Sequence, residues 1–256
     1  MSATFNLPQV PSTPPSVSYI DFASTPLAKW YSGSYALVVD NLFSPQECED
    51  LIALAELATR KIQGGPLPTD QILNTRYRHN DRILRFDHDA AKKIYERVLP
   101  IVENDIGTIK EGSKWGTIVG GGNGDQVRGT WNLVGLNERL SFLRYGPGHF
   151  FKKHLDGRLD LPDGRKSRVT IQIYLNGSDT ATLEGGATRF CDPGYWYPKD
   201  LGANVDFQPK FLDVVPKTGS ALIFQQRGLY HSGETVQEGL KYTMRTDFMF
   251  EQIFSN

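Results

Sequence analysis

The sequence predicts an α+β fold that is mainly β, with N-terminal helices packed on one sheet of a sandwich or barrel of jelly-roll type. Three observations support this prediction. Helical amphipathic patterns occupy residues 44–58 and 88–106. From about residue 130 onward, short β-prone runs are separated by turn residues, with no helical pattern between them. No internal repeat or composition change within the 256 residues indicates a second domain.

The N-terminal third contains the predicted helices. Residues 1–34 are rich in Pro and Ser, so we expect a flexible arm without chemistry, followed by a single domain over residues 35–256. After the β-prone run Tyr35–Asp40, Ser44 begins a helix in which Pro45 is the first helical residue and Glu47 completes a capping box. Two helices ahead of a run of strands predict helices on one face of a sheet.

Two polar or glycine-rich segments are predicted to be irregular. Residues 62–82 contain a cluster of Arg, His and Asn, which indicates either a solvated loop or a loop that presents arginines to a polar or anionic substrate group. The glycines of residues 120–124 precede a β-prone run rather than a helix, which favours a flexible hairpin or lid over a phosphate-binding loop. The strands expected downstream are 139–145, 149–154, 168–176, 187–191, 211–216, 220–225, 229–231 and 241–251.

The composition excludes several classes of protein. A net charge of −1 gives no reason to expect nucleic acid as a partner. No stretch approaches the roughly 20 apolar residues of a transmembrane helix, and the N-terminus lacks the pattern of a signal peptide. Two isolated cysteines, Cys48 and Cys191, favour a reducing compartment. We therefore expect an intracellular protein, cytoplasmic or nuclear, without a membrane partner.

Residues 145–156 contain the first candidate metal ligands. His154 and Asp156 follow the Pro147-Gly148 turn and an aromatic run that is typical of a strand. Alternate residues of a strand point to the same face, so an imidazole and a carboxylate would lie side by side. A surface histidine paired with an aspartate is the alternative.

The third candidate ligand is His231, which follows the apolar run Ser220–Phe224. A lone histidine in this position is more often structural, but together with the upstream pair it completes a set of two imidazoles and one carboxylate. Such a facial triad holds iron in non-haem Fe(II) oxygenases and leaves positions open for a co-substrate and O₂.

The last predicted strand contains two cations on one face. By period-two alternation Lys241 and Arg245 share that face with Thr243 and Asp247. Two buried cations need a partner, and the distal carboxylate of a dicarboxylate co-substrate would provide one. An outward, solvated charged face is the alternative.

The chain resembles the iron(II)- and 2-oxoglutarate-dependent oxygenases, and among them the prolyl 4-hydroxylase-like group. The matching stretches are Leu140–Gly157 (LSFLRYGPGHFFKKHLDG), Arg168–Phe190 (RVTIQIYLNG…LEGGATRF) and Pro216–Phe250 (PKTGSALIFQQRGLYHSGETVQEGLKYTMRTDFMF). The resemblance implies a double-stranded β-helix with a catalytic core at about residues 139–252.

The resemblance also implies roles for individual residues. His154, Asp156 and His231 would ligate Fe(II). The residues that match positions around 2-oxoglutarate are Tyr145, Tyr174, Thr188, Lys241 and Arg245. Lys241 follows His231 at the spacing of the prolyl-hydroxylase-like group, whereas Arg245 matches the longer spacing of other branches, so either cation is a candidate for the distal carboxylate.

The implied activity is hydroxylation of an unactivated C–H bond, coupled to the conversion of 2-oxoglutarate and O₂ into succinate and CO₂. The implied cofactors are Fe(II), 2-oxoglutarate and O₂, with ascorbate left open as an accessory. The substrate is expected to be a protein residue such as peptidyl proline, or a small metabolite. A cupin-like metal-binding isomerase or non-redox small-molecule binding protein is one alternative, and a non-catalytic β-sandwich interaction module is another.

Overall fold

The computed structural model describes residues 13–62, 76–120, 127–180, 182–194 and 210–254. Within them, a large antiparallel sheet forms the centre of the fold. Its nine strands are β1 (Ser16–Tyr19), β2 (Ala36–Asp40), β13 (Ala221–Gln225), β9 (Lys166–Tyr174), β16 (Lys241–Ile253), β6 (Thr130–Leu136), β5 (Thr108–Ile109), β7 (Arg139–Tyr145) and β4 (Asp81–Phe86). Strand β16 pairs with β9 along one side, and with β7 and then β6 along the other. It is therefore the central strand of the sheet.

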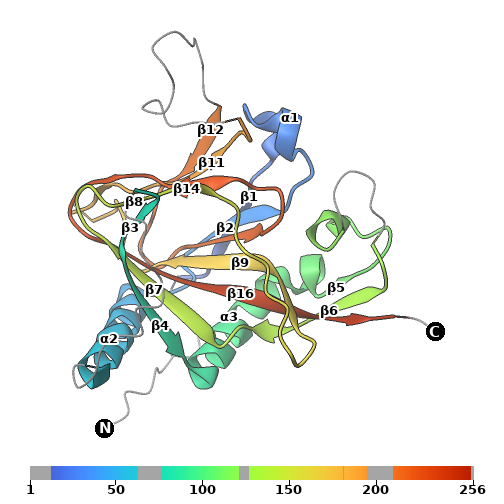
Figure 1. The fold of residues 1–256 in the computed structure, drawn as a ribbon, viewed down its shortest axis with the longest axis horizontal. Coiled ribbons are helices and arrows are strands. Elements are labelled where there is room, and N and C mark those ends of the chain that lie inside the picture. Colours follow the sequence, from blue (N-terminus) through green and yellow to red (C-terminus); the bar gives the residue numbers. More distant parts are fainter. Residues whose placement is uncertain (1–12, 63–75, 121–126, 181, 195–209, 255–256) are drawn as a thin grey trace.

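A second, smaller sheet lies over one face of the large sheet (Figure 1). It contains, in spatial order, β12 (Phe211–Val214), β11 (Thr188–Cys191), β14 (His231–Gly233), β8 (Phe150–His154) and β3 (Arg78–His79). A two-stranded sheet of β10 (Glu184–Gly185) and β15 (Val236–Glu238) lies beside it. These facing antiparallel sheets confirm the expected jelly-roll architecture.

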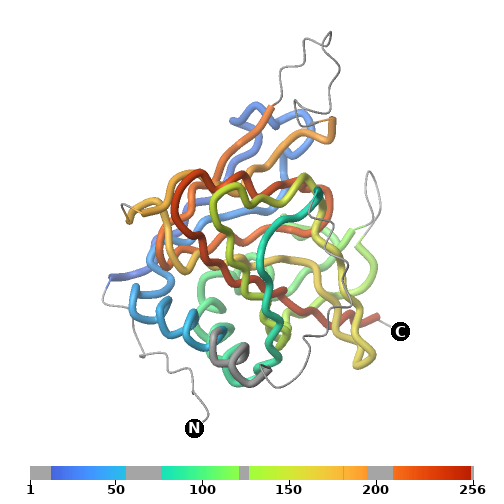
Figure 2. The backbone as a smooth tube through the Cα atoms, turned by 60° about the vertical axis from the view of Figure 1, so that its left-hand side comes forward, coloured from blue at the N-terminus to red at the C-terminus, as the bar shows by residue number. Residues whose placement is uncertain are grey.

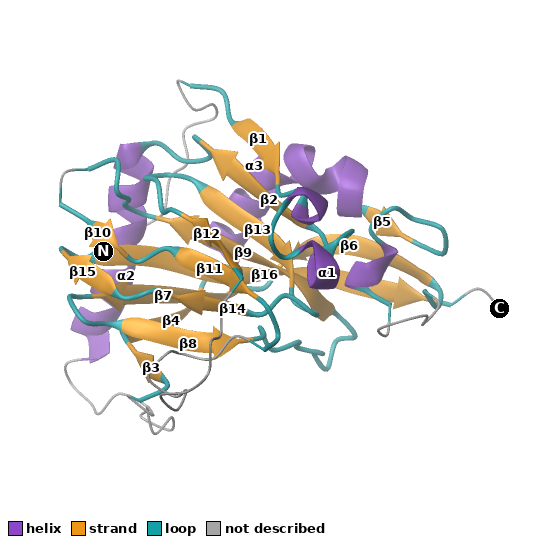
Figure 3. Ribbon diagram, turned by 90° about the horizontal axis from the view of Figure 1, so that it is seen from above, coloured by secondary structure: helices purple, strands orange, loops and turns teal. Residues whose placement is uncertain are grey.

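Helices α2 (Pro45–Ile62) and α3 (His88–Ile106) cover the opposite face of the large sheet, as Figure 3 shows from above. Leu51 of α2 and Ile94 of α3 are fully buried, in the same apolar cluster as Ile171 of β9 and Phe248 of β16. Each such buried side chain contributes roughly 1.5–3 kcal/mol to folding. The expectation of helices packed on one sheet is confirmed.

The start of α2 follows the predicted capping box. The backbone N–H of Glu47 donates to Ser44 Oγ at 3.2 Å, and the backbone N–H of Ser44 donates to Glu47 Oε2 at 2.8 Å. The same Glu47 oxygen accepts from Arg97 of α3 at 2.7 Å. The cap therefore also joins the two helices.

The expected flexible arm over residues 1–34 is wrong for its described part, residues 13–34. Strand β1 pairs with β2 at the sheet edge, and the segment continues through the short helices η1 (Phe22–Ser24) and α1 (Ala28–Tyr31). This blue segment runs beside orange and red strands from the last third of the chain (Figure 2). Phe22 and Tyr31 are buried in one apolar cluster with Phe190. Burial of these side chains outweighs the irregular Pro/Ser composition.

The interpretation of residues 62–82 as a solvated loop is wrong from residue 78 onward. Arg78 and His79 form β3, and Asp81 begins β4, which pairs with residues 139–144 of β7. A strand is recognised in the sequence by apolar residues that alternate with polar ones. In β4 this pattern is not visible, because Arg82 faces a polar cavity where an apolar residue would face a core. Residues 63–75 of this segment lie outside the described part of the chain. Residues 121–124 of the glycine-rich segment, for which we expected a flexible hairpin or lid, also lie outside it.

The other expected strands are present within a few residues of their predicted bounds, including β7, which is predicted exactly as Arg139–Tyr145. Helix η2 (Gly116–Ile118) precedes β6. Cys48 and Cys191 are buried free thiols. None of the described helices is long and apolar enough to cross a membrane.

Candidate metal centre

The pairing of two strands in the small sheet brings the candidate metal ligands together. Strand β8 ends at His154, and in the antiparallel ladder with β14 His154 lies directly opposite His231. Opposed side chains of an antiparallel pair lie on the same face of the sheet, and the two imidazole rings are 4.3 Å apart between centroids. Asp156 lies two residues beyond the end of β8 and is buried. Strand pairing therefore joins residues that are far apart in the sequence.

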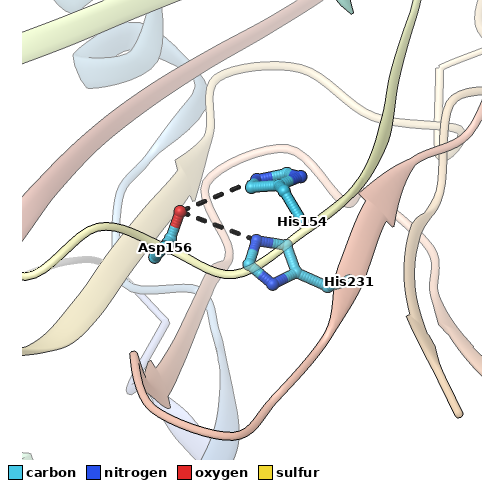
Figure 4. A group of neighbouring side chains, drawn as sticks. All are labelled: His154, Asp156 and His231. Carbon is cyan, nitrogen blue, oxygen red and sulfur yellow. Dashed lines mark ion pairs between the residues drawn. The ribbon is translucent and has the colours of Figure 1, made fainter. Parts of the chain in front are cut away.

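The three side chains converge on one point (Figure 4). One ligand atom from each of His154, Asp156 and His231 lies within 4.8 Å of the others. The Nε2 atoms of both histidines are 3.7 Å from Asp156 Oδ1. These separations are too long for hydrogen bonds, so the three groups do not satisfy one another.

Hydrogen bonds on the outer side of each ring orient the imidazoles. His154 Nδ1 lies 2.8 Å from the carbonyl oxygen of Lys152, and His231 Nδ1 lies 3.0 Å from that of Leu229. A carbonyl only accepts, so each Nδ1 carries the proton and donates it. Each Nε2 consequently presents its lone pair toward the shared point, which is the state in which imidazole binds a metal.

The electrostatics keep the ligand set in its metal-binding protonation state. Burial, together with the neighbouring His231, lowers the pKa of His154 to about 3, and burial also lowers the pKa of His231. Burial alone would raise the pKa of Asp156, but Arg245 and the two histidines outweigh it and lower the pKa to about 2. Two neutral imidazoles and one carboxylate are therefore present at neutral pH, and this donor set fits a divalent iron.

The second oxygen of Asp156 is held by residues of the large sheet. Thr170 Oγ1 donates to Asp156 Oδ2 at 2.7 Å, and Arg245 Nη2 lies 3.3 Å from the same oxygen. Arg245 also donates to Asp247 Oδ1 at 3.1 Å, which in turn accepts from Gln226 Nε2 at 2.9 Å. This network fixes the carboxylate and leaves Oδ1 directed at the histidines.

Sequence reasoning missed Thr170 and Gln226. Thr170 belongs to the alternating run Arg168–Tyr174, in which Val169, Ile171 and Ile173 are fully buried. The polar residues between them face the opposite side of the strand, the side on which Tyr174 was identified. That alternation could have indicated that Thr170 lies on the side of the strand that faces the site. Gln226 follows the end of β13, and no sequence pattern distinguishes it.

A second group of predicted residues surrounds Lys241. Lys241 is 2% exposed. Its ammonium group donates to the carbonyl oxygen of Gly186 at 2.5 Å and lies 5.4 and 5.5 Å from the ring centroids of Tyr145 and Tyr174. The Tyr174 hydroxyl donates to Thr188 Oγ1 at 2.7 Å. Tyr145, Tyr174, Thr188 and Lys241 therefore gather at one place, whereas Arg245 lies with Asp156.

The Lys241 ammonium group has no carboxylate beside it in the part of the chain that the structure describes. Among the described residues, no Asp or Glu lies within ion-pair distance of Nζ, and burial lowers the pKa of Lys241 to about 7. Gly186, at a φ of +70°, allows the chain to pass the lysine stem, because a Cβ there would lie 3.1 Å from Lys241 Cδ. The solvated charged face considered for this strand is thus excluded at Lys241.

One cavity of about 410 Å³ connects the two groups. Its lining includes the three candidate metal ligands, together with Tyr145, Thr188, Lys241 and Arg245. A volume in this range is typical of small-molecule sites. The metal-binding end and the lysine end therefore belong to one pocket.

Comparison with known proteins identifies the family of this core. Residues 140–248 match the sequence model of the 2OG-Fe(II) oxygenase superfamily, which confirms the family that the sequence resembles. Comparison with curated proteins gives no match.

Two solved structures align with most of this chain. A prolyl-4-hydroxylase from Pseudomonas putida aligns with a TM-score of 0.50 and 14% identity, over 89% of this chain and 94% of that one. The viral collagen prolyl hydroxylase of Paramecium Bursaria Chlorella virus-1, solved with 2OG, aligns with a TM-score of 0.46 and 17% identity, over 86% and 97% of the two chains. At these identities the likeness to the Pseudomonas enzyme shows the fold, and it confirms the predicted double-stranded β-helix.

Proposed function

We propose that this chain, whose residues 140–248 belong to the 2OG-Fe(II) oxygenase superfamily, is a dioxygenase that hydroxylates an unactivated C–H bond. One observation carries the proposal. Two imidazole nitrogens and a carboxylate oxygen converge within 4.8 Å, in the same pocket as a buried lysine without a carboxylate partner among the described residues. The pocket therefore combines a metal site with a cation that can bind one carboxylate of a dicarboxylate.

His154, Asp156 and His231 would hold Fe(II). When bound, the metal and 2-oxoglutarate supply the oxidation, in which one oxygen atom of O₂ enters the substrate C–H bond and the other enters succinate as CO₂ is released. The chain's own residues position this chemistry. The carbonyls of Lys152 and Leu229 orient the imidazoles, and Thr170 and Arg245 orient the carboxylate.

Lys241 would hold the distal carboxylate of 2-oxoglutarate. A charge-assisted hydrogen bond from a buried ammonium is stronger than a neutral one. The distal carboxylate would also be the charge partner that Lys241 does not find among the described residues. Tyr145 lies beside the ammonium, and the Tyr174–Thr188 hydrogen bond fixes the neighbouring wall. Arg245 is already engaged by Asp156 and Asp247, so its proposed role is to position the metal ligand.

The substrate completes the pocket beside the metal. The proposed classes are a protein residue, such as proline in a peptide, and a small metabolite. A cupin-like isomerase or binding protein would require the metal ligands but would leave a buried lysine at the far end of the cavity without a function. The position of Lys241 therefore favours the oxygenase.

Anaerobic reconstitution tests the proposal. Protein is loaded with Fe(II) and 2-oxoglutarate, then exposed to O₂ with a panel of peptides and metabolites, and succinate, CO₂ and products heavier by one oxygen atom are measured. We expect equal amounts of succinate and hydroxylated product for a true substrate.

A non-redox control separates binding from turnover. Mn(II) with 2-oxoglutarate should raise the melting temperature more than Mn(II) alone in the wild type. His88→Ala, at an exposed position on α3, should behave like the wild type. Absence of any Mn(II)-dependent 2-oxoglutarate binding in the wild type would refute the proposal.

A further inference from the structure

The pocket contains more cations than the proposed cofactors use. In addition to Lys241 and Arg245, its lining includes Arg78, Arg82, Arg139 and Arg158. Asp156 and Asp247 are the acidic side chains among the described lining residues. A cavity with this excess of guanidinium groups is unusual because buried cations are costly without counter-charges.

Three of these arginines lie on strands of the two sheets, Arg158 lies beyond the end of β8, and all four line the same cavity. On β7, Arg139 shares the pocket side with Ser141, Leu143 and Tyr145, whereas Leu140 and Phe142 lie in the apolar core against the helices. Arg82 lies on the adjacent strand β4, opposite Leu143.

Arg78 enters from the small sheet and lies close to the metal ligands. Its guanidinium carbon is 4.5 Å from the centroid of the Phe151 ring, and that ring stacks on His154 at 3.6 Å. A group held by Arg78 would therefore lie only one aromatic ring away from the first candidate ligand.

The charges of the proposed complex already balance without Arg78, Arg139 and Arg158. Fe(II), the 2-oxoglutarate dianion, Lys241, Arg245, Asp156 and Asp247 together sum to zero. Among the described residues, no carboxylate forms an ion pair with Arg78, Arg139 or Arg158. Arg78 donates to the neutral amide oxygen of Asn80 at 2.8 Å, and Arg158 donates to the carbonyl oxygen of Ile118 at 2.8 Å.

The arginines also lie near enough to repel one another. Burial, and then the neighbouring cations Arg78, Arg139 and Arg245, together lower the pKa of Arg82 to about 10. Burial, and the nearby Arg245, lower the pKa of Arg78. Because like charges in a partly desolvated cavity raise its free energy, an anion bound between them would be stabilised.

We propose that the substrate of this enzyme carries an anionic group, a carboxylate, phosphate or sulfate, and that Arg78 and Arg139 bind that group beside the metal. This inference rests on the proposed oxygenase function and narrows its substrate class. Guanidinium groups bind such planar or tetrahedral anions with two hydrogen bonds each. A neutral prolyl side chain without an acidic neighbour would provide no anion for Arg78 and Arg139.

A binding measurement with a defined probe tests the inference. Sulfate, a weak ligand for metals, is titrated calorimetrically into the complex of the protein with Mn(II) and 2-oxoglutarate. We expect saturable binding in the wild type and at least about tenfold weaker binding in Arg139→Gln and Arg78→Gln. Arg144→Gln is the matched control, because Arg144 lies on β7 but is exposed and paired with Asp81.

A turnover measurement then identifies the source of the anion. Carboxylic acids are compared with their amides, phosphate esters with their parent alcohols, and acidic peptides with neutral ones, and products heavier by one oxygen are counted. We expect anionic members to have at least about tenfold lower KM than their neutral partners. Oxidation of free acids alone would indicate a small metabolite, and oxidation of acidic peptides alone would indicate a protein residue.

The outcomes separate the two proposals. If the wild type binds Mn(II) and 2-oxoglutarate but shows no saturable sulfate binding, or if Arg139→Gln and Arg78→Gln bind sulfate as the wild type does, the anion proposal is wrong and the oxygenase proposal stands. Loss of sulfate affinity in both variants with unchanged 2-oxoglutarate affinity supports the anion proposal. If the wild type fails to bind 2-oxoglutarate, both proposals fall.

Discussion

Lys241 and Arg245 lie on the same face of β16, four residues apart, yet their surroundings differ. Arg245 is held between Asp156 and Asp247, at 3.3 and 3.1 Å from their oxygens. Lys241 is more deeply buried, but it meets a carbonyl oxygen and the faces of two tyrosines. The first cation is paired within the protein, and the second is not paired with a carboxylate among the described residues.

This difference separates two roles that the sequence left open. A buried cation already paired with carboxylates gains little from an incoming anion, whereas one without such a pair gains the full charge-assisted hydrogen bond. The metal end of the pocket is therefore organised by the protein's own carboxylates. The lysine end is complementary to a carboxylate that none of the described residues provides.

Removal of the metal-end carboxylate should have the largest effect. We expect Asp156→Ala to reduce turnover to less than about a thousandth of the wild-type rate, because the metal loses its one anionic ligand. Metal affinity and succinate formation measure the loss, and circular dichroism should show an unchanged fold. Wild-type turnover in this variant would remove Asp156 from the metal site.

Exchange of each cation for methionine tests the comparison directly. We expect Lys241→Met to weaken 2-oxoglutarate binding by about 100-fold, since a hydrogen bond to a charged group is worth roughly 1.5–3 kcal/mol. Mn(II) affinity should change little in this variant. Calorimetry with each ligand separates the two effects.

Arg245→Met is the matched variant at the other end of the pocket. Its loss should weaken Mn(II) binding more than 2-oxoglutarate binding, because Asp156 would lose one of the two groups that orient its carboxylate toward the histidines. If Arg245→Met instead lost more 2-oxoglutarate affinity than Lys241→Met, the assignment of roles would be reversed.

Removal of the Thr170 hydroxyl, which orients Asp156, should have a smaller effect on metal affinity. Thr170→Val removes the hydroxyl that donates to Asp156 Oδ2 while keeping the shape of the side chain. Residues that orient a metal ligand typically contribute 10- to 100-fold in metal affinity, so we expect a loss of about tenfold in the Mn(II) dissociation constant. An unchanged affinity would show that Arg245 alone orients the carboxylate.

The smallest predicted effect is a pH dependence confined to the lysine end. Burial places the pKa of Lys241 near 7 in the ligand-free protein, below its usual value of 10.5, and only the protonated ammonium binds a carboxylate well. Binding of 2-oxoglutarate must therefore be accompanied by proton uptake above pH 7, and the affinity should fall by less than about tenfold between pH 7 and 8. Calorimetry in buffers of different ionisation enthalpy measures the proton uptake.

The same shift affects stability in the opposite direction. Because the folded pKa of Lys241 lies below the unfolded value, the unfolded chain binds more protons from about pH 7 to 10.5, so this lysine makes the ligand-free protein more stable as the pH rises through that window. Lys241→Arg stays protonated and should flatten the pH dependence of 2-oxoglutarate binding. A steep dependence that persists in this variant would point to another group.

The fold was predictable where local pattern and packing agree. The strand bounds of β7 and the capping box at Ser44 follow from alternation and cap chemistry, which act between neighbours in the sequence. Residues 13–34 were mispredicted because Phe22 and Tyr31 are buried by partners far along the chain, such as Phe190. Strand β4 was missed because Arg82 lies on its inward face, where a sequence pattern for a strand would have an apolar residue.

The sequence alone determined which residue types the site contains, because the types and spacing of His154, Asp156 and the two late cations are local properties of the chain. Only the tertiary structure decided their assembly. The antiparallel register of β8 and β14 sets His231 opposite His154. Of the side chains that the structure describes around β16, two carboxylates lie within ion-pair distance of Arg245 and none within that distance of Lys241. Charge partners depend on distances across the fold, which sequence spacing does not encode.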